Sequence, residues 1–173
     1  MVGADNQQER LGNYVAGYVD GEGSFHIGIQ KSRYVKLGYQ LVPEFHVSQN
    51  TDRNEVLVLI KEILGCGYIK PNDKNNPNDN SEVLVVRDRK DLITKVIPFF
   101  ERYPIISSKQ EDFKKFAQII YSMERGEHLQ RDSLIKLIEK AFSMNGKGKY
   151  RRWNLKDITA SLESSETIRQ TPM

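Results

Sequence analysis

The chain has 173 residues and a formal net charge of +3, from 26 Lys and Arg against 23 Asp and Glu. This length suits one domain, or a domain with an extension, and the mildly basic balance permits nucleic-acid binding without requiring it. The single cysteine excludes an internal disulfide framework and a four-cysteine zinc site, and it suits a reducing compartment. No apolar run approaches the ~20 residues of a membrane span, and the polar first ten residues do not resemble a signal or transit peptide.

The first predicted element is a helix that begins at Leu11 and ends at the glycines near residue 21. Its apolar face has helical spacing and comprises Leu11, Tyr14, Val15, Tyr18 and Val19. A second face has almost no side-chain volume and comprises Gly12, Asn13, Ala16 and Gly17, with Asp20 beside them. Glycine inside a helix costs about 1 kcal/mol relative to alanine, so we interpret this stripe as a surface for close packing against another helix. The plain alternative is an amphipathic helix with a glycine-rich cap.

Two strands follow, each with one buried face. In the first, the apolar residues Phe25, Ile27 and Ile29 alternate with polar or small ones. The second spans residues 39–49, and its Pro43 favours an edge or a bulge. The outward face of these two strands carries mainly polar side chains with little charge. This face is either a solvated surface or a ribbon that reads bases. A strand of about nine residues rises roughly 30 Å, close to one turn of DNA, and such a ribbon fits the major groove.

The rest of the chain predicts further strands and helices around the same sheet. In chain order they are a helix over 56–64 capped by Thr51 or Asp52, a hairpin of strands beginning at Tyr68 and Ser81, a helix after Asp88 cut by Pro98, a helix capped by Ser108 with Glu111, a helix over 132–144, and a short helix capped by Asn154. This is a mixed α+β domain with one antiparallel sheet. The basic residues around 145–156 form either a solvated linker or a phosphate-contacting segment.

The segment Val15-Ala16-Gly17-Tyr18-Val19-Asp20-Gly21-Glu22-Gly23 resembles the signature of the LAGLIDADG homing endonucleases. The Gly-Cys-Gly-Tyr-Ile turn at residues 65–69 and the block over 97–110 are similar to this family too, so the resemblance covers roughly residues 11–153. It implies a mixed α-β-β-α-β-β-α core with a saddle-like antiparallel DNA-binding sheet, plus C-terminal helices. A single motif copy implies a homodimer with the motif helix at its interface, formed by Gly12, Asn13, Ala16 and Gly17. We expect a polar tail over 1–10, one endonuclease domain over 11–153, and a short helix with a disordered tail over 154–173.

The resemblance also implies a catalytic centre at the foot of the motif helix. Glu22 matches the metal-binding acidic position, the Gly21 carbonyl assists it, and Asp20 is the weaker ligand candidate. Magnesium, with manganese as a substitute, is the implied cofactor, since it prefers such oxygen ligands. Gln49 and Arg53 match positions that order water and bind phosphate charge, although Arg53 alone also fits an ordinary helix-surface arginine. Lys109 is the one lysine near the family's basic position, and a serine at the expected place leaves open whether the enzyme is slow or inactive.

The implied partner is double-stranded DNA. The residues that we expect to contact it are Ser24, His26, Gly28, Gln30, Lys31, Arg33, Lys36, Gln40, Glu44, His46, Ser48, Lys70, Glu82, Lys147, Lys149, Arg151 and Arg152.

The function that this resemblance implies is a site-specific, metal-dependent endonuclease that hydrolyses both DNA strands at a long pseudo-palindromic site. Two alternatives stay open: an RNA maturase that assists splicing of its own intron, and a non-cleaving DNA-binding regulator. Intron RNA is accordingly a second candidate partner, and no membrane is expected. We expect an intracellular, intron-encoded protein of an organelle or a prokaryotic cytoplasm.

Overall fold

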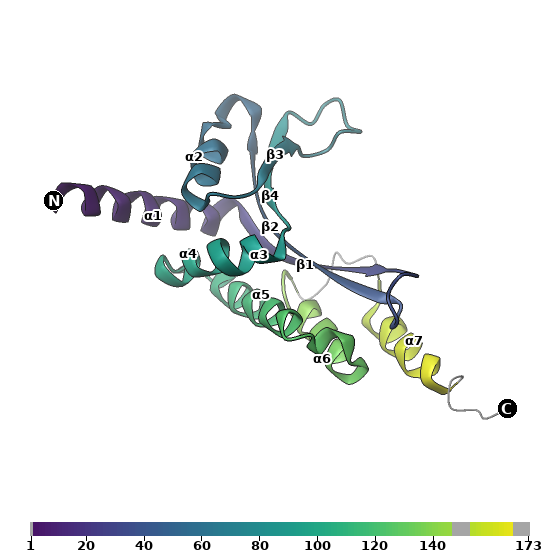
Figure 1. The fold of residues 1–173 in the computed structure, drawn as a ribbon. Coiled ribbons are helices and arrows are strands. Elements are labelled where there is room, and N and C mark those ends of the chain that lie inside the picture. The colour runs from purple at the N-terminus through teal and green to yellow at the C-terminus, as the bar shows by residue number, and fades with distance from the viewer. Residues whose placement is uncertain (1, 147–152, 168–173) are drawn as a thin grey trace.

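Four antiparallel strands form a single sheet in the computed structural model, which describes residues 2–146 and 153–167 (Figure 1). The strands are β1 (Gly23–Lys31), β2 (Tyr39–Asn50), β3 (Tyr68–Pro71) and β4 (Ser81–Val86), and their order in the sheet is β1-β2-β4-β3. Phe25 pairs with Phe45, and Phe45 pairs with Val86, so these three residues share one face. The predicted strands, the hairpin and the α+β class are confirmed.

The helices around the sheet are α1 (Val2–Glu22), α2 (Glu55–Leu64), α3 (Arg89–Asp91), α4 (Ile97–Arg102), α5 (Lys109–Glu124), α6 (Arg131–Phe142) and α7 (Leu155–Thr167). Short 3-10 turns span Thr51–Arg53 and Glu127–Leu129, and a π-helical turn spans Leu92–Val96. Helices α5 and α6 pack against β1, whereas α1 meets both β1 and β2. None of the helices in the described ranges combines the length and apolarity that a bilayer crossing requires.

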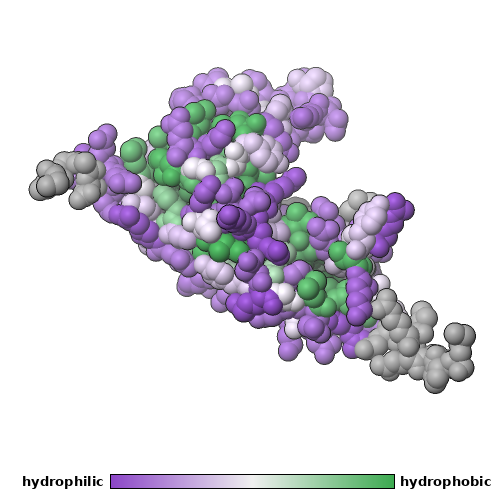
Figure 2. Space-filling model, viewed as in Figure 1, coloured by the Kyte–Doolittle hydropathy of each residue, from purple (hydrophilic) through white to green (hydrophobic). Residues whose placement is uncertain are grey.

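Helix α1 is longer than its apolar pattern predicts. It begins at Val2 rather than Leu11, so the expected polar tail is helical through most of its length. Residues 6–10 are exposed, and this end of the helix projects from the body of the molecule (Figure 1). Figure 2 shows hydrophobic residues exposed between α1 and α2, with further ones toward the α6 and α7 end of the same face. Polar helix turns leave no apolar periodicity, and for that reason the pattern misplaced the start of the helix.

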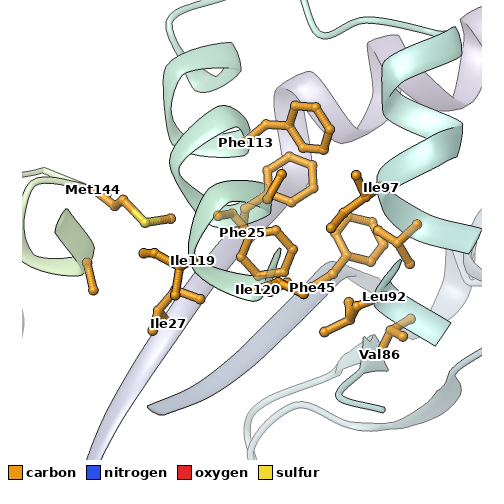
Figure 3. Packing of buried hydrophobic residues seen from close by; sticks show 14 of the residues in the cluster. Phe25, Ile27, Phe45, Val86, Leu92, Ile97, Phe113, Ile119, Ile120 and Met144 are labelled. Carbon is orange, nitrogen blue, oxygen red and sulfur yellow. The ribbon is translucent and has the colours of Figure 1, made fainter. Parts of the chain in front are cut away.

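The core is organised around buried aromatic rings between the sheet and the helices. Phe25 of β1 packs against Phe45, Phe100, Phe113 and Phe116, with ring centroids 5.1 to 5.4 Å apart. Figure 3 shows Phe25, Phe45 and Phe113 among the aliphatic side chains of the same cluster. Because this layer covers one face of the sheet, the alternating polar residues of β1 and β2 are left on the other face.

Three local predictions needed correction. Pro98 does not cut its helix: a π-helical turn precedes it, with the Ile97 N–H bonded to the Leu92 carbonyl, and the chain continues helically to Arg102. The cap of α2 is Asn54, without a side-chain bond, rather than Thr51 or Asp52. The Ser108 hydroxyl does not cap α5; the Ser107 hydroxyl accepts the Lys109 N–H instead.

Other local predictions are confirmed. The Asn154 side chain accepts the Lys156 N–H at the start of α7. Cys66 is buried, and burial raises the pKa of its thiol to about 11, in keeping with a packing role. The prediction for Pro43 holds only locally: β2 is a central strand rather than an edge strand, but at Pro43 only β1 pairs with it, since pairing with β4 starts at Phe45.

Candidate active site and nucleic-acid interface

Glu22 is the last residue of α1, and β1 starts directly after it. Its side chain is exposed, and within the described residues no hydrogen bond or ion pair engages its carboxylate. Its charge nevertheless acts on Tyr18 and on Lys109, which places these groups around one site. Glu22 is therefore an available oxygen ligand at the foot of the helix.

Asp20, two residues earlier, is engaged within the fold. Its carboxylate accepts the Ser107 N–H at 3.1 Å and also accepts the Ser107 hydroxyl. Burial opposes ionisation of this carboxyl, but the bonds from Ser107 outweigh it and lower the Asp20 pKa. This arrangement supports the interpretation of Asp20 as a helix-end stabiliser that ties α1 to the segment before α5.

Lys109, the first residue of α5, lies beneath the end of α1. Its Nζ donates to the carbonyls of Val19 at 2.9 Å and Gly23 at 2.6 Å, and it lies 3.5 Å from the carbonyl of Gly21. Burial lowers the pKa of its ammonium, while Asp20 and Glu22 act in the opposite direction. A cation at the carbonyl end of a helix is favourable, so Lys109 both neutralises this end and sits beside Glu22.

Gln49 lies near the end of β2, and Arg53 lies at the end of the 3-10 turn that follows this strand. The Gln49 amide donates to the Tyr18 hydroxyl, and its oxygen accepts the Asn50 N–H at 2.7 Å. Burial raises the Tyr18 pKa, the bond from Gln49 opposes the rise, and Glu22 adds to it. Arg53 ends the adjacent 3-10 turn with an exposed side chain. The structure thus gathers Glu22, Gln49 and Lys109 at one end of the sheet, with Arg53 on the turn that leaves it.

The ligand set of a single chain is small. The described residues contain no group of three or more His, Cys, Asp and Glu side chains arranged to hold a metal ion. What they offer is the exposed Glu22 carboxylate and, beside it, the Gly21 carbonyl. Both are hard oxygen donors of the kind that magnesium and manganese bind, so the residues fit the implied cation in type.

The exposed small-residue face of α1 differs from the predicted one. Gly12 and Ala16 face inward: a Cβ on Gly12 would lie 2.4 Å from the ring of Tyr103, and Ala16 is buried. The prediction that these two residues form the dimer interface is wrong, because their own domain already covers them. Asn13 and Gly17 are exposed, and a Cβ on Gly17 or on Gly21 would meet no atom within 4 Å in the part of the chain that the structure describes. The open face of the helix therefore runs along Asn13, Gly17 and Gly21.

The outward face of the sheet carries most of the predicted DNA contacts. Register places on this face Ser24, His26, Gly28 and Gln30 of β1, Gln40, Glu44, His46 and Ser48 of β2, and Lys70 of β3. Glu82 is a correction, since it pairs with Gln49 and lies on the helix-covered side. Its carboxylate accepts the Asn54 amide at 2.6 Å, so it serves the start of α2.

The predicted basic contacts lie at the far end of the sheet. Lys36 and Arg33 belong to the turn between β1 and β2, and Lys31 lies at the end of β1 with its ammonium 4.6 Å from the centre of the Trp153 ring. Lys147, Lys149, Arg151 and Arg152 lie outside the described residues.

Sequence reasoning missed three residues of these surfaces. Tyr18 was assigned to the apolar face, but its hydroxyl holds Gln49. The sequence predicts a cap at Ser108, whereas the capping hydroxyl belongs to Ser107. Helix ends predicted from sequence are easily displaced by one residue. Arg87 follows β4 and donates through Nε to Glu44 on the outward face. Strand alternation continued from Val85 would have placed Arg87 on the outward face. No sequence signal linked Tyr18 to Gln49.

Comparisons with known proteins bear on the family and the fold of the chain. Residues 15–120 match the family model described as LAGLIDADG endonuclease. DNA endonuclease I-CeuI of Chlamydomonas moewusii is 32% identical over 127 residues, which is 73% of this chain and 57% of that protein. The chain spans between 15% and 57% of the length of the curated relatives described as DNA or intron-encoded endonucleases.

Two solved structures are matched over most of their length. The homing endonuclease I-TnaI has a TM-score of 0.74 and 38% identity, covering 88% of this chain and 96% of that one. The archaeal intron-encoded homing endonuclease I-Vdi141I, complexed with DNA, has a TM-score of 0.81 and 30% identity, covering 92% and 98%. The expected α-β-β-α-β-β-α arrangement thus has close structural counterparts.

Proposed function

The chain belongs to the LAGLIDADG endonuclease family, and from that premise we propose that it is a divalent-metal-dependent, site-specific endonuclease of double-stranded DNA that acts as a homodimer. The observation that carries the proposal is the unengaged Glu22 carboxylate at the foot of α1, beside Gln49 and Lys109. Asp20, by contrast, is bonded to Ser107, so a single carboxylate is left for chemistry at this site. We extend the proposal to an intron-encoded origin, because several relatives are described as intron-encoded endonucleases.

Phosphodiester hydrolysis requires an activated water and neutralisation of charge on the phosphate. In this proposal Glu22 and the Gly21 carbonyl hold magnesium, or manganese in its place. When bound, such a cation lowers the pKa of water and stabilises the charge that develops on phosphate oxygens. The residues of the chain then do the remaining work of orienting water and binding the substrate.

Gln49 is suited to orienting the attacking water. One of its amide protons is used by Tyr18 and one oxygen lone pair by Asn50, which leaves one donor and one acceptor position on the same amide. Arg53 is exposed on the adjoining turn and supplies a guanidinium for the charge of the transition state. Lys109 holds the end of α1 through the Val19 and Gly23 carbonyls, so it keeps Glu22 in place.

Two features support the homodimer: the number of free carboxylates at the site and the open face of α1. The described residues of one chain offer a single free carboxylate at the site, and a second copy supplies a matching group for the other strand. Packing of Asn13, Gly17 and Gly21 against the same face of a second copy brings two α1 helices together, with their feet adjacent. Each copy then contributes one Glu22 and one outward sheet face.

Duplex DNA as the substrate is supported by the shape and chemistry of that face. β1 and β2 present polar side chains in alternation, as a ribbon in the major groove requires. The structural relative I-Vdi141I is described in complex with DNA. A symmetric pair of such sheets reads a long, nearly palindromic site.

The test is cleavage of a randomised duplex-DNA library with magnesium, and binding to it with calcium, by the wild type and Glu22→Gln. We expect magnesium-dependent cutting of both strands at one long near-palindrome, abolished in Glu22→Gln while binding persists. The matched control is Glu139→Gln, an exposed glutamate on α6 in the helical layer, which we expect to cut normally. Specific binding without cutting would contradict the enzyme and favour a regulator. Neither binding nor cutting of duplex DNA, with binding of structured RNA, would favour a maturase.

A further inference from the structure

Glu44 lies in the middle of the outward face, but its carboxylate is already bonded on two sides. It accepts a hydrogen bond from Nδ1 of His46 at 3.0 Å and another from Nε of Arg87. Its side chain is only 17% exposed, against 51% for Arg87. Because both oxygens of Glu44 are bonded and its side chain is largely buried, Glu44 is less accessible to a base than Arg87, which reaches into solvent.

The register fixes where Arg87 stands. Phe45 pairs with Val86, so Arg87 continues the row that Glu44 forms with His26 across β1 and β2. Alternation after Val85 directs it to the same outward face as Ser48 and His46. Arg87 thus belongs to the central part of the face that the proposed function assigns to the DNA major groove.

We propose that Arg87 reads a guanine in each half of the target site, and that Glu44 is a positioning residue that holds Arg87 in place rather than a base contact. This inference rests on the proposed function, because it requires the outward face to lie in the major groove. It changes the role that the sequence predicted for Glu44 and adds a specificity residue that the sequence analysis did not identify.

The hydrogen-bonding capacity of arginine supports the assignment. A guanidinium has five N–H donors in a fixed plane, and the bond to Glu44 uses the one on Nε. Within the described residues the terminal Nη groups of Arg87 have no hydrogen-bond partner, so a pair of parallel donors remains. In the major groove only guanine presents two adjacent acceptors, O6 and N7, which match that pair. The carboxylate of Glu44 restricts the rotation of the guanidinium and makes this geometry available before binding.

The experiment compares base preference at every position of the selected site for wild type, Arg87→Ala, Arg87→Lys and Glu44→Gln. Binding is measured in calcium, so the preference is scored without cutting. In the wild type we expect one guanine in each half-site whose replacement weakens binding about 10- to 100-fold. Arg87→Ala removes that preference and leaves the other positions unchanged. Arg87→Lys keeps the charge beside Glu44 but cannot bind both acceptors, so it loses most of the same preference.

Glu44→Gln separates positioning from contact. If Glu44 positions Arg87, its variant relaxes the guanine position and no other; if it contacts a base itself, a different position relaxes, which would contradict the assignment. Arg125→Ala is the control for loss of one cation, since Arg125 lies at the end of α5 and pairs with Glu127. We expect its base preferences to equal those of the wild type.

Two further results would overturn the inference while leaving the proposed function intact. In the first, Arg87→Ala weakens binding to every sequence equally and reduces the salt dependence, which identifies a phosphate contact. In the second, the guanine preference survives in a folded Arg87→Lys variant, with folding verified by circular dichroism. Failure of the wild type to bind any duplex DNA would instead overturn the proposed function, and the assignment of Arg87 with it.

Discussion

The Tyr18 hydroxyl accepts a hydrogen bond from the Gln49 amide and so joins the motif helix to the end of β2 across 31 residues of sequence. The other end of the same amide accepts the Asn50 N–H. Both ends of Gln49 are therefore held, and a flip of the amide would set its NH2 group against the Asn50 N–H, where two donors cannot form a bond. Tyr18 positions a residue that is proposed to orient water, although it has no direct part in the chemistry itself.

We predict that Tyr18→Phe lowers the single-turnover cleavage rate about fivefold and leaves DNA affinity unchanged. Loss of one hydrogen bond is worth about 1 kcal/mol, and 1.4 kcal/mol is a factor of ten in rate. Gln49→Leu should slow cleavage more, and adding Tyr18→Phe to it should have little further effect, because both act through the same amide. Rates measured at saturating magnesium would test both statements.

Tyr121→Phe is the control for removal of a phenolic hydroxyl. Tyr121 lies on α5 in the helical layer, away from the foot of α1. Its variant should cleave at the wild-type rate. An additive effect of Tyr18→Phe and Gln49→Leu would show that Tyr18 does not act through Gln49.

The comparison of Tyr18 with Phe25 shows what the sequence could predict and what it could not. The alternation from Phe25 to Ile29 placed one face of β1 in the core, and the structure agrees because a period of two has a single buried solution. Tyr18 also fits an apolar pattern, but the pattern cannot reveal that its hydroxyl meets a residue 31 positions away. Gly12 and Gly17 were indistinguishable by composition, and only the position of Tyr103 separates them. Contacts between distant segments depend on tertiary packing, which local periodicity does not encode.

Asp20 and Glu22 should separate cleanly in function and in stability. We predict that Asp20→Asn lowers the free energy of unfolding by about 1 kcal/mol, because an amide accepts the two Ser107 bonds less strongly than a carboxylate. Ser107→Ala should cost a similar amount, and the double variant should cost less than the sum. Urea unfolding measures these values.

The same variants distinguish the roles of the two acids in cleavage. Asp20→Asn should keep metal-dependent cutting within about tenfold of the wild type, whereas Glu22→Gln should unfold like the wild type and not cut. Loss of cutting in Asp20→Asn, with stability preserved, would assign Asp20 to the metal instead.

Glu44 predicts a specific acid dependence of stability. Its pKa falls from an ordinary 4.5 to about 2, chiefly through the bond from His46, with burial opposing and Arg87 adding to the fall. A folded pKa below the unfolded one contributes stability that is complete above pH 4.5 and is lost as the pH falls toward 2. At about 1.4 kcal/mol for each pKa unit, the contribution is at most about 3 kcal/mol.

Unfolding in urea from pH 7 down to pH 2 tests this dependence. The difference in stability between the wild type and Glu44→Gln should be largest at pH 7 and should shrink between pH 4.5 and 2. Glu139→Gln, an exposed glutamate on α6, should follow the wild type at every pH. A constant difference for Glu44→Gln over this range would show that the contacts of Glu44 do not depend on its ionisation.

Gly12 and Gly17, five residues apart on α1, should respond in opposite ways to the same substitution. Gly12→Ala places a methyl group 2.4 Å from the Tyr103 ring, which Phe99 packs against at 5.0 Å and which cannot easily move. We predict a loss of about 1 to 3 kcal/mol in unfolding free energy. The methyl group of Gly17→Ala meets no atom of the described residues within 4 Å, so helix propensity alone should stabilise the isolated fold by up to about 1 kcal/mol.

Association provides the decisive readout for Gly17. If its open face packs against a second α1, Gly17→Leu should shift the protein from dimer to monomer in sedimentation velocity while its helical circular dichroism stays unchanged, because two backbones in close contact leave no room for a side chain. Cleavage should fall with the dimer fraction, since each copy contributes one Glu22. A Gly17→Leu variant that remains dimeric and cuts normally would place the interface on another face of α1 and would leave Gly17 as a solvent-exposed glycine.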